Sequence, residues 1–153
     1  MMKDKKIVIF DLDGTLADIT QRRALATDIG TGKMDWDIFF DPKHIDLDVP
    51  KDQVVQMADM LSKQGYTIWI LSGRSDVTHQ ATVDWLGKHD IWYDHLVMRP
   101  KKYHYTKDSD LKKMWLDTIG VDKVAMVFDD RQQVVDMWRA QGLTCFQVAD
   151  GDF

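Results

Sequence analysis

Acidic pairs stand directly after two apolar runs of this sequence. Asp11 and Asp13 follow one run, with Gly14 permitting a sharp turn behind them, and Asp129 and Asp130 follow another. An Asp-Gly pair alone is a common turn signal and would decide nothing. Carboxylate oxygens at two strand ends are, however, the ligands that Mg²⁺ prefers. The sequence therefore indicates a magnesium site.

Polar residues also follow two other apolar runs. Ser72 comes after Leu71, with Arg74 two residues further on, and Arg99 comes after Met98. Charges left at the edge of a sheet are costly if they are buried without partners. A metal ion and a phosphate would pair all of these groups at once.

The elements that must position these residues alternate between strand and helix patterns. Strands are expected at residues 7–10, 66–71, 95–98, 124–128 and 144–148. Helices are expected at residues 54–62, 77–86, 111–119 and 134–141. This alternation predicts an α/β fold, with a central parallel sheet and helices on both faces. The carboxyl ends of such strands meet at one edge, where open α/β sheets hold their active sites.

The segment at about residues 20–50 is expected to be irregular, within a single domain spanning residues 1–153. One interpretation is a surface loop pinned to the core by Trp36, Phe39 and Phe40. The other is a small cap or flap whose aromatic rings can stack on a base. Residues 30–33, Gly-Thr-Gly-Lys, lack the flanking Gly and Ser or Thr of a P-loop, so no nucleoside-triphosphate site is expected.

Composition limits the class of protein. The chain has 153 residues, 44% of them hydrophobic and 29% charged, which is typical of a globular domain. Its net charge of −5 disfavours a broad footprint on a nucleic acid duplex but says little about a short end or a single nucleotide.

The lone Cys145 and the short apolar run near the N-terminus lead us to expect a cytoplasmic protein without a membrane segment. No histidine shows metal-ligand spacing or any catalytic mark, and nothing supports an oligomer.

The order of these groups resembles the haloacid dehalogenase (HAD) superfamily over nearly the whole chain. Its first motif, Asp-x-Asp-Gly-Thr, is matched by residues 11–15, and its second, a Ser or Thr at a strand end, by Ser72. Its third, a lysine, is matched by Lys112, and its fourth, an acidic pair, by Asp129 and Asp130. The resemblance implies a three-layer Rossmann-like core and a Mg²⁺-dependent phosphatase.

The resemblance also implies roles for the acidic residues. Asp11 would attack phosphorus and form an aspartyl-phosphate. Asp13 would protonate the leaving oxygen and then activate water, so its pKa must be shifted to keep it protonated at the first step. Asp11, the backbone carbonyl of Asp13 and Asp129 would hold Mg²⁺, with Asp130 either a ligand or a partner of metal-bound water.

Ser72 and Lys112 would bind the equatorial phosphate oxygens. The lysine is chosen because the run Lys-Asp-x-x-x-Lys, which ends at Lys112, is typical of the family. Its neighbours remain alternatives: Lys101, Lys102, Lys107 and Lys113.

A closer similarity is to the 3′-phosphatase domain of bacteriophage polynucleotide kinase-phosphatases. Residues 129–139 and 147–153 look like the C-terminal part of that domain. The resemblance implies that substrate contacts come from Arg22, Arg74, Arg99 and Thr15. The chain differs in lacking the kinase half and its P-loop.

Three functions follow from these residues. The leading one is removal of a 3′-phosphate from nucleic acid ends or nucleotides. The second is hydrolysis of free nucleoside monophosphates or another small nucleotide, which the acidic net charge favours. The third, a protein that binds a phosphorylated ligand without turnover, would fit the loss of Asp11 or Asp13, and both are present.

Overall fold

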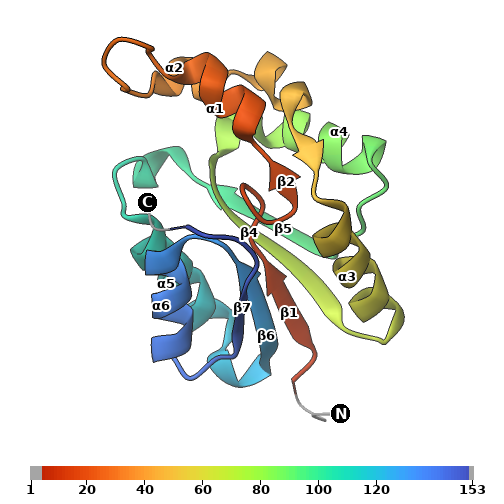
Figure 1. Cartoon of the computed structure of the whole chain (residues 1–153). Coiled ribbons are helices and arrows are strands. Elements are labelled where there is room, and N and C mark those ends of the chain that lie inside the picture. Colours follow the sequence, from red (N-terminus) through yellow and green to blue (C-terminus); the bar gives the residue numbers. More distant parts are fainter. Residues whose placement is uncertain (1–4, 152–153) are drawn as a thin grey trace.

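A parallel sheet forms the centre of the computed structural model, which describes residues 5–151 (Figure 1). Its strands lie in the order β5-β4-β1-β6-β7. Their bounds are β1 Ile7–Phe10, β4 Thr67–Ser75, β5 His95–Arg99, β6 Val124–Asp129 and β7 Cys145–Gln147. All five expected strands are confirmed. Strand β4 runs further than expected, because residues as far as Ser75 still pair with β5.

Helices cover both faces of the sheet. Buried side chains of α3 (Asp52–Lys63) and α4 (His79–Lys88) pack on one face, and those of α5 (Asp108–Ile119) and α6 (Gln132–Ala140) pack on the other. The expected α/β, three-layer Rossmann-like fold is therefore confirmed. The start of the second expected helix was wrong, because Val77 lies in the short 3₁₀ helix η2 (Asp76–Thr78) that precedes α4. Two further 3₁₀ turns complete this part of the fold, η3 (Lys101–Tyr103) and η4 (Val121–Lys123).

The register of the central strands places the catalytic candidates at one level. Phe10 of β1 pairs with Ile70 of β4 on one side and with Phe128 of β6 on the other. Asp11 and Asp129 each come one residue later. Because parallel strands run in the same direction, both carboxylates leave the same edge of the sheet.

The segment between β1 and α3 forms a small cap over this edge (Figure 1). It leaves and returns through a two-stranded antiparallel ribbon of β2 (Ala17–Asp18) and β3 (Val49–Pro50). It is less irregular than expected, because it contains α1 (Thr20–Ala26), α2 (Trp36–Phe39) and the 3₁₀ helix η1 (Pro42–Leu47). The start of α2 is stabilised by the Asp35 side chain, which accepts hydrogen bonds from two backbone N–H groups.

Within residues 5–151, no helix combines the length and the apolar character needed to cross a membrane. Two parts of the sequence expectations lie outside the described residues. These are the start of the chain, residues 1–4, and the end of the C-terminal similarity, residues 152–153.

Candidate active site

Three aspartates converge at the carboxyl edge of the sheet. Asp11, Asp129 and Asp130 each offer an oxygen atom within 4.8 Å of the others, and all three residues are buried. Asp11 comes from the end of β1, Asp129 is the last residue of β6 and Asp130 follows it. A buried donor set made only of carboxylate oxygens fits Mg²⁺. The sequence prediction placed these same residues together.

The carboxylates repel one another in this crowded position. Burial, together with the charge of Asp129, raises the pKa of Asp11 well above its ordinary value. Burial also raises the pKa of Asp130. Neighbouring like charges disfavour ionisation in both cases, and a divalent cation would remove that cost. The electrostatics of the cluster therefore also fit a metal ion.

Lys112 is the cation that partly balances this cluster. Its Nζ donates to Asp11 Oδ1 at 2.7 Å and to Asp129 Oδ2 at 3.2 Å, and the residue is 1% exposed. Burial acts to lower the lysine pKa, but the two carboxylates outweigh it and hold the pKa well above its usual value.

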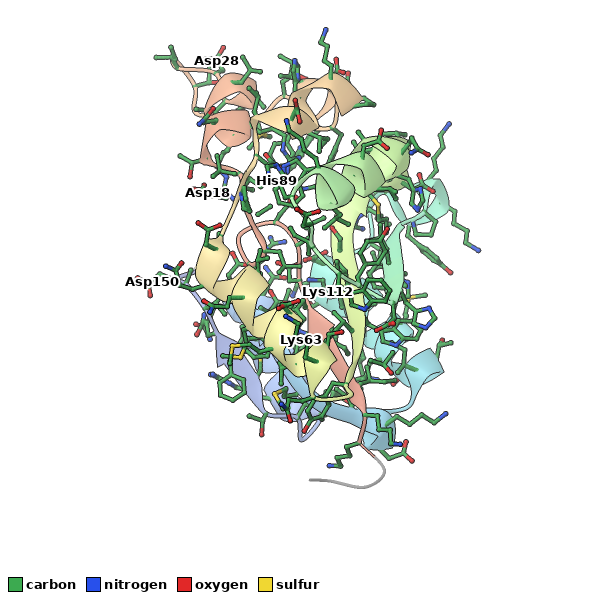
Figure 2. All side chains as sticks on the ribbon, turned by 90° about the vertical axis from the view of Figure 1, so that its right-hand side faces the viewer. Asp18, Asp28, Lys63, His89, Lys112 and Asp150 are labelled. Carbon is green, nitrogen blue, oxygen red and sulfur yellow. The ribbon has the colours of Figure 1, made fainter. Side chains whose placement is uncertain are left out.

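The alternative lysines lie elsewhere. Lys101, Lys102 and Lys107 are exposed, and Lys113 pairs with Asp117 along the outer face of α5. Figure 2 places Lys112 near the middle of the molecule. Among the lysines considered from the sequence, the geometry favours Lys112.

Thr15 was expected to contact substrate, and the structure gives it a different place. It is fully buried, with its hydroxyl 3.3 Å from Asp11 Oδ2 and 3.2 Å from Asp130 Oδ1. Its hydroxyl group therefore helps to orient the carboxylates of Asp11 and Asp130. The neighbouring Gly14 has a φ of +84°, and a Cβ there would lie 2.1 Å from Asp130 Oδ2. The turn of the first motif thus needs glycine for both its conformation and the space beside Asp130.

Asp13 lies in a second cluster, with Arg22, Arg74 and Asp48. Arg22 Nη2 donates to Asp13 Oδ1 at 2.8 Å, and Arg74 Nη2 donates to the same oxygen. Burial acts to raise the pKa of Asp13, but the guanidinium groups of Arg74 and Arg22 outweigh it and hold the pKa below its ordinary value. The two arginines therefore favour the ionised form of Asp13, whereas the acid role expected from the sequence needs a proton on Asp13 at the first step of the reaction.

Arg22 does not line the active-site pocket, contrary to its expected substrate contact. Its Nε donates to Asp48 Oδ1 at 3.0 Å and its Nη1 to the Phe39 carbonyl at 3.1 Å, while Nη2 is held by Asp13. The side chain is fully buried. Arg22 therefore joins the cap to the core and fixes Asp13.

Arg74 and Arg99 do line the pocket. Arg74 also donates to Thr82 and Asp48, yet its Nε has no hydrogen-bond partner within the part of the chain that the structure describes. Arg99 donates to the carbonyls of Gly73, Tyr103 and Thr106. Its main visible role is to hold the backbone between β5 and α5.

Ser72 and Asp129 are buried beside the pocket. The Ser72 hydroxyl accepts a hydrogen bond from the Arg74 backbone N–H at 3.1 Å. The Asp129 carboxylate accepts from the Trp138 indole N–H at 3.1 Å and from the Asp130 backbone N–H at 2.8 Å. Trp138, which its sequence pattern indicates only as a core residue, therefore also orients a metal-ligand candidate.

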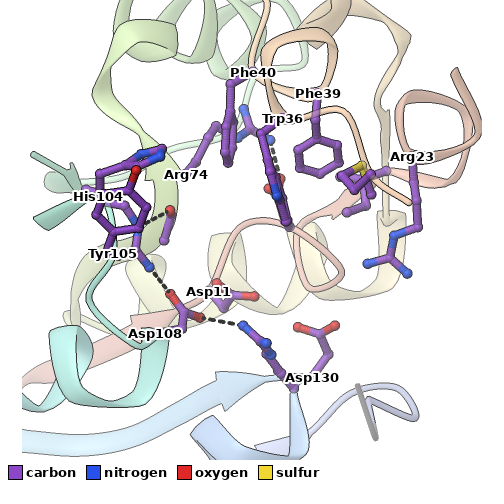
Figure 3. Close-up of a pocket in the computed structure, with 16 residues that line it drawn as sticks. Asp11, Arg23, Trp36, Phe39, Phe40, Arg74, His104, Tyr105, Asp108 and Asp130 are labelled. Atoms are coloured by element: carbon purple, nitrogen blue, oxygen red, sulfur yellow. Dashed lines mark hydrogen bonds and ion pairs between the residues drawn. The ribbon is translucent and has the colours of Figure 1, made fainter. Parts of the chain in front are cut away.

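A pocket of about 420 Å³ opens above the carboxylates (Figure 3). Asp11, Asp13 and Asp130 line its charged end. The cap contributes an apolar wall that includes Trp36, Phe39 and Phe40. The loop before α5 contributes His104 and Tyr105, and the first residue of α5 contributes Asp108. The cap aromatics were identified from the sequence.

Sequence reasoning missed Asp48, Asp108 and Tyr105. Asp48 and Tyr105 lie outside every motif used in the sequence analysis. Asp108 is the second residue of the Lys-Asp-x-x-x-Lys run that ends at Lys112, but that run was used only to locate the lysine. Asp108 pairs with Arg99 at 3.1 Å and lies 3.8 Å from Arg131 and 3.9 Å from Lys112. It therefore connects the pocket wall to Lys112.

Comparison with known proteins gives matches over almost the whole chain. The family model described as polynucleotide kinase PNKP phosphatase domain matches residues 5–153. A chain from a Pnkp1/Rnl/Hen1 RNA repair complex is 37% identical, with a TM-score of 0.79, and the match covers 97% of this chain and 44% of that chain. A chain from a second Pnkp1/Rnl/Hen1 complex is 35% identical with the same TM-score of 0.79, covering 99% and 48% of the two chains.

The present chain thus spans less than half the length of these two relatives. A more distant structure, a predicted phosphatase from Clostridium acetobutylicum, shares the fold with a TM-score of 0.71 at 16% identity. That match covers 94% of this chain and 84% of the other.

Proposed function

Because the chain belongs to the family of polynucleotide kinase PNKP phosphatase domains and is a HAD-type phosphatase, we propose that it removes 3′-phosphates from nucleic acid ends. The observation that carries the proposal is the convergence of Asp11, Asp129, Asp130 and Lys112 beside a pocket of about 420 Å³, whose lining includes Asp11 and Asp130. Two relatives from RNA repair complexes support a polynucleotide substrate.

Asp11 is the nucleophile in this proposal. Lys112 holds one of its carboxylate oxygens and Thr15 lies beside the other, so the group is fixed before substrate arrives. Attack on phosphorus forms an aspartyl-phosphate and releases the 3′-oxygen. Fixed orientation against a bound phosphate makes a weak carboxylate nucleophile effective.

Mg²⁺ would be held by Asp11, Asp129, Asp130 and the backbone carbonyl of Asp13. When bound, it supplies positive charge that offsets repulsion between the carboxylates and the phosphate. In this proposal Ser72 and Lys112 bind phosphate oxygens, and Arg74, which lines the pocket, supplies a further donor.

Asp13 is the general acid and base of the proposed reaction. Its side chain lines the pocket and is 21% exposed, which leaves it accessible to the leaving oxygen. Without substrate, Arg74 and Arg22 hold its pKa below the ordinary value, which favours ionisation. The negative charge of an incoming phosphate opposes that ionisation and raises the pKa toward the value that proton donation needs. Asp13 then takes a proton from the water that hydrolyses the aspartyl-phosphate.

The direct test compares four substrates with the same base: a 3′-phosphorylated oligonucleotide, its 5′-phosphorylated isomer, and the free 3′- and 5′-mononucleotides. We expect kcat/KM for the 3′-phosphorylated oligonucleotide to exceed that for the 5′ isomer by at least about tenfold, since each contact made only by the correct end adds about 1 kcal/mol or more. The Asp11→Asn variant is the control for contaminating phosphatases. Equal rates on both oligonucleotides would contradict the proposal.

A second candidate is a phosphatase of free nucleoside monophosphates. The net charge of −5 favours this candidate, because a negative protein attracts a long polynucleotide less than a small nucleotide. A pocket of about 420 Å³ also does not need a long polynucleotide to fill it. Faster hydrolysis of mononucleotides than of both oligonucleotides would select this function instead.

A further inference from the structure

Two large aromatic side chains of the pocket wall are exposed to solvent. Trp36 is 55% exposed and Tyr105 is 97% exposed, and both line the pocket that contains Asp11. Aromatic side chains that line a concave pocket beside a few polar groups are typical of a ligand-binding site. A phosphate group needs charged and hydrogen-bonding neighbours rather than rings. These two rings are therefore placed to contact the part of the substrate that carries the phosphate group.

Trp36 is held in place before any ligand binds. Its ring stacks on Phe40 with centroids 5.8 Å apart, and it meets Phe39 edge to face at 5.7 Å. Phe39 is itself buried, with the Arg22 guanidinium 4.3 Å from its ring centre. Figure 3 shows Trp36 and Phe40 hanging from the cap above Asp11. A ring that is already fixed loses little conformational entropy on binding.

The backbone that carries Tyr105 is also fixed. Arg99 Nη1 donates to the carbonyl of Tyr103 at 2.7 Å and to that of Thr106 at 2.6 Å, on either side of the His104–Tyr105 pair. The Tyr105 ring packs edge to face on His104, with centroids 4.8 Å apart. A single arginine thus pins both ends of the segment that presents this ring to the pocket.

We propose that the base of the nucleotide carrying the phosphate stacks against Trp36 and Tyr105, which makes these rings the determinant that distinguishes nucleotides from other phosphoesters. This inference rests on the proposed activity toward nucleotides. Stacking suits the site because every base presents a π-face, so one wall serves all sequences. The cap and the loop before α5 together form the base site, while the sheet edge forms the phosphate site.

The test compares two substrates, a phosphorylated dinucleotide and the same compound with an abasic sugar at the phosphorylated position. Base discrimination is kcat/KM for the first substrate divided by kcat/KM for the second. Both 3′- and 5′-phosphorylated pairs are assayed with the full chain. The variants are Trp36→Ala, Tyr105→Ala and Tyr105→Phe. Trp92→Ala is a matched control, because Trp92 is 58% exposed and does not line the pocket. Thermal melts check that each variant is folded.

We expect discrimination to fall about tenfold in Trp36→Ala and in Tyr105→Ala, in line with the effect of removing one stacking ring. Tyr105→Phe and Trp92→Ala should keep the wild-type ratio. A wild-type ratio near one, or equal loss on both members of a pair in Trp36→Ala, would overturn the base site while leaving the phosphatase intact. Discrimination seen only with 5′-phosphorylated pairs would support the base site and contradict the proposed 3′ specificity.

Discussion

Lys112 is the residue on which the charge balance of the site depends. It is the one lysine among the sequence candidates that lies between Asp11 and Asp129, and it is almost completely buried. Removing one partner of a buried ionic cluster leaves the others unpaired. The same ammonium group is the proposed phosphate ligand, so its loss affects the site with and without substrate.

Lys112→Met should lower kcat/KM by at least about 100-fold, which corresponds to losing one well-oriented donor to the transition state, about 2–4 kcal/mol. Lys113→Met is the matched control on the same helix, since the Lys113 ammonium group pairs with Asp117 on the outer face of α5. It should stay within about twofold of wild type. Steady-state kinetics with a single phosphoester substrate gives kcat/KM for both variants and for the wild-type protein. A strong loss in Lys113→Met with a mild one in Lys112→Met would reverse the assignment.

At the level of elements, the end of β4 and the start of α5 approach closely around Gly73. A Cβ at Gly73 would lie 2.0 Å from Asp108 Oδ1, and Asp108 is the first residue of α5. Asp108 in turn holds Arg99 and lies near Lys112. The absence of a side chain at Gly73 therefore allows the helix to bring its lysine to the sheet edge.

Gly73→Ala should lower the free energy of unfolding by about 1–3 kcal/mol, because the added methyl group forces Asp108 or the backbone to move. Activity should fall with it. The control is Gly87→Ala in α4, where a Cβ would meet no atom within 4 Å. There we expect stability to rise by about 0.5–1 kcal/mol, as glycine is unfavourable inside a helix. Denaturant unfolding measures both, and an unchanged Gly73→Ala protein would refute this packing argument.

The elements that the sequence predicted well are the buried ones. Residues 7–10 and 124–128 are apolar runs inside a parallel sheet, where burial on both faces leaves a clear pattern. The cap helix α2 has only 4 residues, too few for a helical period to be seen. The polar end of β4, residues 72–75, carries no strand signal, because its pairing with β5 depends on the neighbouring strand.

The candidate site divides in the same way. Asp11, Asp129 and Asp130 were found because motif spacing and strand ends locate them without tertiary information. Asp48 lies far from any motif, and only folding of the cap brings it onto Arg22 and Arg74. Residues that reach the site only through tertiary contacts, such as Asp48, cannot be predicted from a local sequence pattern.

For the whole molecule, the candidate metal site links separate parts of the chain. Its ligand candidates follow β1 and β6, and α5 and α6 supply the side chains that hold them. A ligand that binds the folded state but not the unfolded one stabilises the entire domain. Magnesium should therefore be visible in global stability as well as in catalysis.

Adding Mg²⁺ at about 100 times its dissociation constant should stabilise the fold by about 2.7 kcal/mol and raise Tm. Asp129→Asn should abolish this shift. Asp136→Asn, on the exposed side of α6, should keep it. A chelator should stop activity, and excess Mg²⁺ should restore it. Full activity in excess chelator, or an equal Tm shift in Asp129→Asn, would contradict the metal site.

The claim that Asp11 takes the phosphoryl group can be tested by trapping. The enzyme is mixed with a 3′-phosphorylated oligonucleotide, quenched in acid during turnover, digested and analysed by mass spectrometry. We predict one phosphoryl group on the peptide that contains Asp11, and none in the Asp11→Asn protein, which should also be inactive. A phosphoryl group on a different residue, or normal turnover by Asp11→Asn, would contradict the account.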